Sequence, residues 1–242
     1  MAESAPSPFP LRRYLSYARF LLFETKSVLW MVALIALVNS LISFLHGSTL
    51  FWPVTFLSIL LTTCTTPVFY GIFYHLIDDS YTSVFAIAKT YVPRYLWLLF
   101  RMYLPAILLS SVPAILFAGN NSGGYLEIGL VFFSMLYLYV IPLFYHTGQQ
   151  HQAIAKGIRF LSCNLSASTP LLLTVLLVES SIMLLQYGRS TEEVQPTALT
   201  ACVDFSVFFA ASVIDLAVFI IILYVLRGSD QQSAPGVSGS KL

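Results

Sequence analysis

The sequence predicts an all-α, polytopic membrane protein with six transmembrane helices, and three observations lead to this prediction. First, 57% of the 242 residues are hydrophobic and only 10% are charged, against about 25% charged in ordinary soluble domains. Second, the mean hydropathy of +0.81 leaves too little polar surface to cover a water-soluble globule. Third, long apolar runs recur along the chain without period-two alternation, which favours helices over a transmembrane barrel.

The apolar runs divide the chain into spans and tails. Each run is near or above the roughly 20 residues that a helix needs to cross about 30 Å of hydrocarbon. We expect the polar, Pro-rich residues 1–10 and the residues 228–242 to be disordered tails around a membrane domain at 11–227. The predicted spans are 28–46, 51–77, 95–117, 125–146, 169–187 and 198–226.

The basic residues predict how the chain is threaded, because cytoplasmic loops carry an excess of Lys and Arg. With both termini in the cytoplasm, every one of the 12 Lys and Arg residues except Arg189 falls on the inner side. We therefore predict a multi-pass protein of a cytoplasmic-type membrane, such as the bacterial inner membrane. The ending Ser240-Lys241-Leu242 matches a peroxisomal address and makes a peroxisomal membrane the weaker alternative.

A short repeat predicts how the spans are grouped. Ala86-Ile87-Ala88-Lys89 recurs as Ala153-Ile154-Ala155-Lys156, and each copy precedes an aromatic, basic segment and then a predicted span. Residues 11–26 occupy the same position before the first span. We therefore predict three hairpins, each preceded by an interfacial amphipathic helix. The alternative is that any inner loop of so apolar a protein has this composition.

One segment carries a family resemblance. Residues Ala153 to Phe160 have the form A-x-x-x-G-x-R-F and are followed by a polar break and a long apolar run. In this motif and in its topology the chain resembles uncharacterised six-span, YciC-like proteins of the bacterial inner membrane. It is also similar to the membrane domain found beside some glycerophosphodiester phosphodiesterases. The resemblance implies the fold and the membrane, and it brings no catalytic residues with it.

Two acidic residues lie in the middle of consecutive predicted spans. Glu179 and Asp215 are each about 15 Å from the inner end of their span, so antiparallel packing places them at one level. A charge at that depth costs roughly 2.5–3.5 kcal/mol unless it is partnered or protonated. Other spans contribute polar side chains at a similar depth. The predicted midplane site comprises Glu179, Asp215, Asn39, Thr62, Thr65 and Ser212.

This polar layer has two interpretations. It could relay protons or bind a cationic or hydroxylated solute in a small transporter or proton-coupled channel. Alternatively, Ser, Thr and Asn often join membrane helices through hydrogen bonds of about 0.6 kcal/mol each, and Glu179 stands beside Ser180. The second interpretation needs no solute.

Enzyme and carrier signatures are not found in the sequence. It contains no G-x-S-x-G, Walker A, H-E-x-x-H or G-x-G-x-x-G motif. We therefore predict first a non-catalytic accessory, scaffold or assembly component that contacts the lipid bilayer and other membrane proteins or a second copy of itself. A transporter is the alternative. No cofactor is predicted, and a net charge of +1 indicates no nucleic-acid partner.

Histidine and aspartate residues near the ends of two predicted spans are candidate metal ligands. His75 and Asp78 are three residues apart at the end of the second span, and His146 and His151 leave the fourth on the same predicted side. Such residues can bind a divalent metal. Because no H-E-x-x-H or paired C-x-x-C accompanies them, no metal site is predicted.

Overall fold

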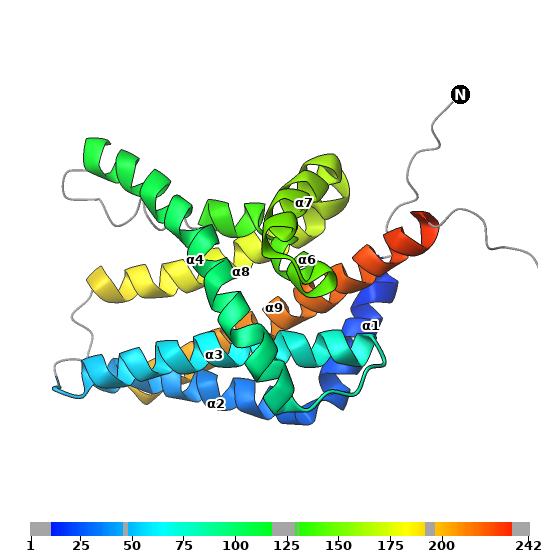
Figure 1. The fold of residues 1–242 in the computed structure, drawn as a ribbon. Coiled ribbons are helices and arrows are strands. Elements are labelled where there is room, and N and C mark those ends of the chain that lie inside the picture. Colours follow the sequence, from blue (N-terminus) through cyan, green and yellow to red (C-terminus); the bar gives the residue numbers. More distant parts are fainter. Residues whose placement is uncertain (1–10, 46–47, 118–128, 130, 192–196, 234–242) are drawn as a thin grey trace, which may run out of the picture.

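The fold is all-helical, as predicted, in the computed structural model. The structure describes residues 11–45, 48–117, 129, 131–191 and 197–233, and these contain no strand (Figure 1). Residues 131–136 form a short helical segment, and a 3₁₀ turn covers Ser43–Leu45. The main helices are α1 (Leu11–Glu24), α2 (Lys26–Ile42), α3 (Phe51–Ile77), α4 (Val84–Phe117), α6 (Val140–Thr147), α7 (Gln150–Cys163), α8 (Leu165–Thr191) and α9 (Ala198–Ser233).

Several helices are built to lie in a membrane. Among the described residues, α3, α4, α8 and α9 are each long and apolar enough to cross a bilayer. The pair of α1 and α2, bent by 82° where the helices meet, adds a fifth span only if it is counted as one. α2 alone has 17 residues, at the lower limit for crossing the hydrocarbon. The described parts therefore contain four helices, or five spans with the bent pair, that are long and apolar enough to cross a membrane, and six spans are not confirmed.

The predicted boundary between an interfacial helix and the third span is wrong, because α4 runs unbroken across it. The two boundaries that do occur contain polar residues whose side chains bond back to the preceding helix. Thr25 Oγ1 donates to the carbonyl of Leu21 at 2.8 Å, and Asn164 Nδ2 donates to the carbonyl of Phe160 at 3.0 Å. Such bonds compete with helix continuation. α1 and α7 are separate helices, and these bonds accompany their ends without being sufficient to cause them, because Thr65 makes the same bond inside the unbroken α3. Pro93 does not end α4.

The predicted fourth span, 125–146, is interrupted in its described part. Residues 131–136 are helical, a turn follows at 137–139, and α6 begins at Val140. The turn includes the residue four positions before Pro142. A proline ring clashes with that carbonyl and has no N–H to offer it. Pro142 therefore favours an interruption at this position.

The predicted tails are tested only in part. α9 continues to Ser233, so residues 228–233 are helical rather than a disordered tail. Residues 1–10 and 234–242, with the terminal Ser-Lys-Leu, lie outside the described residues.

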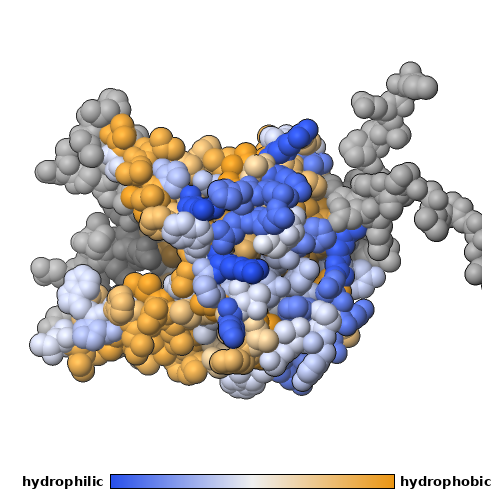
Figure 2. Space-filling model, in the orientation of Figure 1, coloured by the Kyte–Doolittle hydropathy of each residue, from blue (hydrophilic) through white to orange (hydrophobic). Residues whose placement is uncertain are grey.

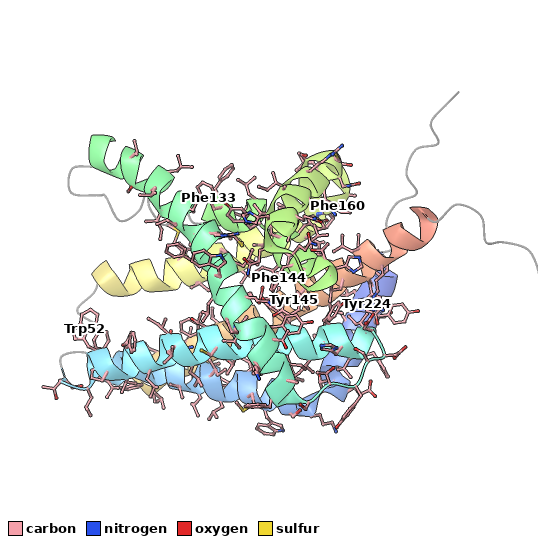
Figure 3. All side chains as sticks on the ribbon, viewed as in Figure 1. Trp52, Phe133, Phe144, Tyr145, Phe160 and Tyr224 are labelled. Carbon is pink, nitrogen blue, oxygen red and sulfur yellow. The ribbon has the colours of Figure 1, made fainter. Side chains whose placement is uncertain are left out.

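The centre of the fold is α9, which packs against α1, α2, α3, α6 and α8. Most of its residues from Leu216 to Leu226 are buried, as expected for a helix that is apolar on all sides. The rings of Tyr14 and Tyr17 stack on Tyr224, with centroids 6.3 and 5.4 Å away. This contact attaches α1 to the C-terminal half of α9 (Figure 3).

Hydrophilic and hydrophobic residues occupy different sides of the surface. Figure 2 shows hydrophilic residues gathered over α7 and the neighbouring part of α4 and on the side of α1, whereas hydrophobic residues cover the far ends of α2, α3 and α4. Trp52, Phe56 and Leu177 are 75%, 70% and 68% exposed. Apolar surface on this scale indicates contact with lipid.

Candidate functional site

Four long helices and the interrupted segment meet around one cavity of about 300 Å³. α3, α4, α8, α9 and residues 134–142 all contribute to its lining. The lining residues that carry carboxyl or hydroxyl groups are Glu179, Asp215, Thr66, Ser134, Tyr70, Tyr95, Tyr103 and Tyr137. The rest of the lining is apolar.

Both predicted midplane acids line this cavity. Glu179 comes from α8 and Asp215 from α9. Asp215 is exposed although it lies in the interior of the central helix, and Glu179 is half-buried. The structure therefore brings the two carboxyl groups to one solvent-accessible space, as the argument from their depth predicts.

Asp215 is held by a buried tyrosine. Tyr70 of α3 donates a hydrogen bond from its hydroxyl to Oδ2 of Asp215. Tyr70 is only 3% exposed, and its ring stacks on Phe219, one turn after Asp215 on α9, at a centroid distance of 4.2 Å. Tyr95 of α4 meets the Tyr70 ring edge-on at 6.2 Å. The donor is therefore fixed by packing, and it orients one oxygen of the acid.

Glu179, the other predicted acid, has surroundings that differ from those of Asp215. Among the residues that the structure describes, no side chain or backbone group forms a hydrogen bond with Glu179. It is therefore available to a ligand or a proton in the cavity, whereas Asp215 already has one partner.

The tyrosines of the lining were missed by sequence reasoning. Tyr70, Tyr95, Tyr103 and Tyr137 were not among the predicted site residues, because tyrosine is common at membrane boundaries. A signal was present, however. Tyr95 and Tyr103 lie eight residues apart, with Tyr91 four residues earlier, so all three fall near one face of α4.

α6 is fixed beside the cavity by another tyrosine. The hydroxyl of Tyr145 donates to the carbonyl of Pro67 in α3 at 2.7 Å. Its ring stacks on Tyr91 of α4 with centroids 4.6 Å apart. Tyr145, labelled in Figure 3, thus joins α3, α4 and α6 near the centre of the fold.

Asn39, another predicted member of the site, lies away from the cavity. Its Oδ1 accepts a hydrogen bond from Ser58 Oγ at 2.6 Å. This bond joins α2 to α3, and Ser58 is only 2% exposed. Asn39 therefore joins two helices.

The three other predicted members also lie outside the cavity lining. Thr65 Oγ1 and Ser212 Oγ each donate to the carbonyl four residues earlier in their own helix, at 2.8 and 2.9 Å. The carbonyl of Thr62 accepts from Thr66, which does line the cavity, at 2.8 Å. Bonding within the helix accounts for the Thr65 and Ser212 side chains, as the alternative interpretation of the polar layer expects.

The four candidate metal ligands do not lie together. His75 Nδ1 lies 2.6 Å from the hydroxyl of Ser80, and His151 Nε2 accepts from Arg101 Nη1 at 2.8 Å. In the described parts of the chain, no group of three or more His, Cys, Asp and Glu side chains is placed to hold a metal ion.

The other two of these residues have different surroundings. Asp78, which follows the last residue of α3, pairs with Arg227 of α9. His146 lines a separate pocket that also contains Lys156 and Arg159.

The acidic cavity has a clear chemical preference. Among the described residues, its lining contains two carboxyl groups and no Lys, Arg or His. Ionised carboxylates in such a space attract a cation, and the faces of tyrosine rings attract cations as well. The tyrosine, threonine and serine hydroxyl groups can also donate to or accept from a polar solute.

Comparisons of the chain with protein-family models, with curated proteins and with solved structures gave no match. The resemblance to YciC-like proteins therefore stays a prediction.

Proposed function

We propose that the protein is a small membrane transporter or proton-coupled channel in which Glu179 and Asp215 bind a cation or exchange protons with it. The observation that carries this proposal is that both acids line one solvent-accessible cavity between membrane-spanning helices. An ionisable residue inside a membrane is costly and is a functional candidate by default, most of all when it faces a cavity.

The lining suggests an organic cation as the solute. The cavity of about 300 Å³ is at the lower end of the range for small-molecule sites. Quaternary ammonium groups bind well between aromatic rings, and one ionised carboxylate of the pair would balance the single positive charge. The Glu179 carboxyl group forms no hydrogen bond with the described residues, and Asp215 is oriented by Tyr70.

The membrane and the orientation are part of the proposal. We place the protein in a cytoplasmic-type membrane, with both termini inside and without a cofactor. Gln150 Nε2 donates to the carbonyl of Arg94 at 2.9 Å. This contact joins the first residue of α7 to α4 and supports placing the two basic segments around Arg94 and Gln150 on one face of the membrane.

A non-catalytic accessory or assembly component is the second candidate. The bonds made by Asn39, Thr65 and Ser212 favour it, because each is the kind of contact that only stabilises helices. In that case the partner is another membrane protein or a second copy of the chain.

Flux through reconstituted vesicles separates the two candidates. The purified full-length chain is placed in liposomes with radiolabelled tetramethylammonium outside and a pH-sensitive dye inside. We expect uptake above that of empty liposomes, with internal pH changing during uptake if protons are exchanged. Glu179→Gln and Asp215→Asn should each reduce uptake at least about tenfold, because a carboxylate about 4 Å from a cation contributes roughly 4 kcal/mol near a protein surface and about 1.4 kcal/mol already corresponds to tenfold.

Asp79→Asn is the matched control. Asp79 is exposed and lies outside the cavity lining. Its φ of 48° is a conformation that Asn tolerates well. Uptake should be unchanged in this variant. The transport proposal would be ruled out if both tetramethylammonium uptake and proton flux stayed at the level of empty liposomes. Equal uptake in Glu179→Gln, Asp215→Asn and Asp79→Asn would rule it out as well.

A further inference from the structure

A second pocket, of about 510 Å³, lies between α6, α7 and the C-terminal half of α9. It shares no lining residue with the acidic cavity. Its lining residues are Leu143, His146, Thr147, Lys156, Arg159, Phe160, Cys163, Asn164 and Leu226.

The polar part of this pocket is basic. Lys156 and Arg159 are exposed, and His146 lies with them in the lining. None of the described lining residues is acidic, and residues 147–168 contain no Asp or Glu. Within the described parts of the chain, Lys156 bonds only to the neutral side chain of Gln152, at 3.2 Å, and Arg159 has no ion pair. The described residues therefore leave the charges of Lys156 and Arg159 without an acidic partner.

The other part of the pocket is apolar. Leu143 comes from α6, Phe160 from α7 and Leu226 from α9. Leu226 is 4% exposed and Leu143 is 6% exposed, so they form a fixed wall. Phe160 packs on Tyr139 with ring centroids 4.9 Å apart, and Figure 3 shows it on α7. A ligand that suits both parts carries an anionic group beside hydrocarbon.

The position of α7 agrees with such a ligand. Ala153, Gly157 and Leu161 are buried on one face of the helix, whereas Lys156 and Arg159 are exposed on another. An amphipathic helix of this kind lies at the level of lipid headgroups. Basic pockets between helices on the cytoplasmic side are sites for anionic headgroups, and guanidinium groups bind phosphate oxygens in pairs.

We propose that this pocket binds the phosphate group of an anionic phospholipid, with Lys156 and Arg159 holding the phosphate and Phe160 and Leu226 contacting the first part of the acyl chains. The apolar wall favours a lipid over free phosphate. The proposal does not depend on transport through the acidic cavity.

Cys163 provides a reporter for this pocket, because it is exposed and lines it. The full-length chain carrying Cys64→Ser and Cys202→Ser is purified in a nonionic detergent, and the rate at which a maleimide labels Cys163 is measured. The added probes are dioctanoyl phosphatidylglycerol, dioctanoyl phosphatidylcholine and inorganic phosphate. We expect phosphatidylglycerol to protect Cys163 at concentrations about tenfold lower than phosphatidylcholine does.

Two pairs of substitutions test the assignment of residues. Lys156→Gln with Arg159→Gln should remove the preference for phosphatidylglycerol. The matched pair Lys89→Gln with Arg94→Gln should keep it. Lys89 occupies the same position in the other Ala-Ile-Ala-Lys copy, and both control residues are exposed and outside the pocket.

The outcomes are distinct. Equal protection by the two lipids, or a preference that survives Lys156→Gln with Arg159→Gln, would overturn the site. Protection by inorganic phosphate as strong as that by phosphatidylglycerol would overturn the lipid assignment. Circular dichroism of each variant establishes that its helices are intact, and the transport assay is not needed for any of these measurements.

Discussion

Tyr70 on α3 and Asp215 on α9 are joined by a hydrogen bond although they stand 145 positions apart in the chain. The tyrosine is buried and the acid is exposed to the cavity. The bond therefore connects the packed interior of the protein to the group that faces the cavity.

The free energy of this bond can be measured with a double-mutant cycle. Tyr70→Phe keeps the ring that stacks on Phe219 and removes only the donor, whereas Asp215→Ala removes the acceptor. We expect a coupling free energy of about 0.5–2 kcal/mol from thermal unfolding in detergent. Tyr103→Phe is the control, since the Tyr103 hydroxyl lines the same cavity and bonds to no described residue. Additive effects of Tyr70→Phe and Asp215→Ala would contradict the bond.

Asn39 should matter for stability and not for flux. Asn39→Ala removes the acceptor of the 2.6 Å bond from Ser58, and Ser58→Ala removes its donor. Either change should lower the free energy of unfolding by about 0.6 kcal/mol, the average for such bonds between membrane helices. Tetramethylammonium uptake per folded molecule should be unchanged. A large loss of uptake in Asn39→Ala would contradict a purely structural role and would indicate that this residue belongs to the functional site.

Two glycines allow close approach of neighbouring helices. A Cβ at Gly71 would lie 2.4 Å from Ile87 Cγ2, and a Cβ at Gly157 would lie 2.7 Å from Val140 Cγ2 and 3.0 Å from the Val140 backbone. We expect Gly71→Ala and Gly157→Ala each to destabilise the protein by about 1–3 kcal/mol, because overpacking forces neighbours to move.

The two glycine variants should differ in how they are rescued. Ile87→Ala removes the atom that Gly71→Ala would meet, so the double variant should regain part of the lost stability. Val140→Ala leaves the Val140 backbone in place, and Gly157→Ala should stay destabilised beside it. Melting temperatures of the four single and two double variants test this expectation. Equal rescue in both pairs would contradict the difference between a side-chain and a backbone contact.

Arg227 should contribute more to the free energy of unfolding than its ion pair with Asp78 accounts for. It donates to Oδ1 of Asp78 and to the carbonyl of Ile77 at the C-terminal end of α3. The Arg227 and Asp78 side chains are 31% and 45% exposed, so Asp78→Asn should cost only about 0.5 kcal/mol, and less in high salt. Arg227→Met also leaves the Ile77 carbonyl without this partner and should cost about 1–2 kcal/mol. Unfolding at low and high salt distinguishes the two contributions.

The apolar runs predicted the long helices well. The span 51–77 coincides with α3, and 198–226 covers the apolar part of α9. The argument from depth also placed Glu179 and Asp215 together, because the rise per residue of antiparallel helices fixes relative height.

Other features depend on contacts that hydropathy does not reveal. The interruption at 137–139 could have been anticipated from Pro142, yet Pro67 lies inside an unbroken α3. A proline therefore favours a break without deciding it. Similarly, a Ser or Thr in an apolar helix bonds to its own backbone unless another partner is near. Thr65 and Ser212 bond in this way and lie outside the cavity lining, whereas Tyr70 reaches across to Asp215.

The central position of α9 has a consequence for biosynthesis. α9 follows in the chain every helix that it packs against, from α1 to α8. During translation those earlier helices must enter the bilayer before α9 is made. Until then, the faces that contact α9 are covered only by lipid or by insertion factors. Assembly is thus completed by the last described segment to leave the ribosome, and a nascent chain halted before residue 198 would expose the surfaces that quality-control proteases recognise.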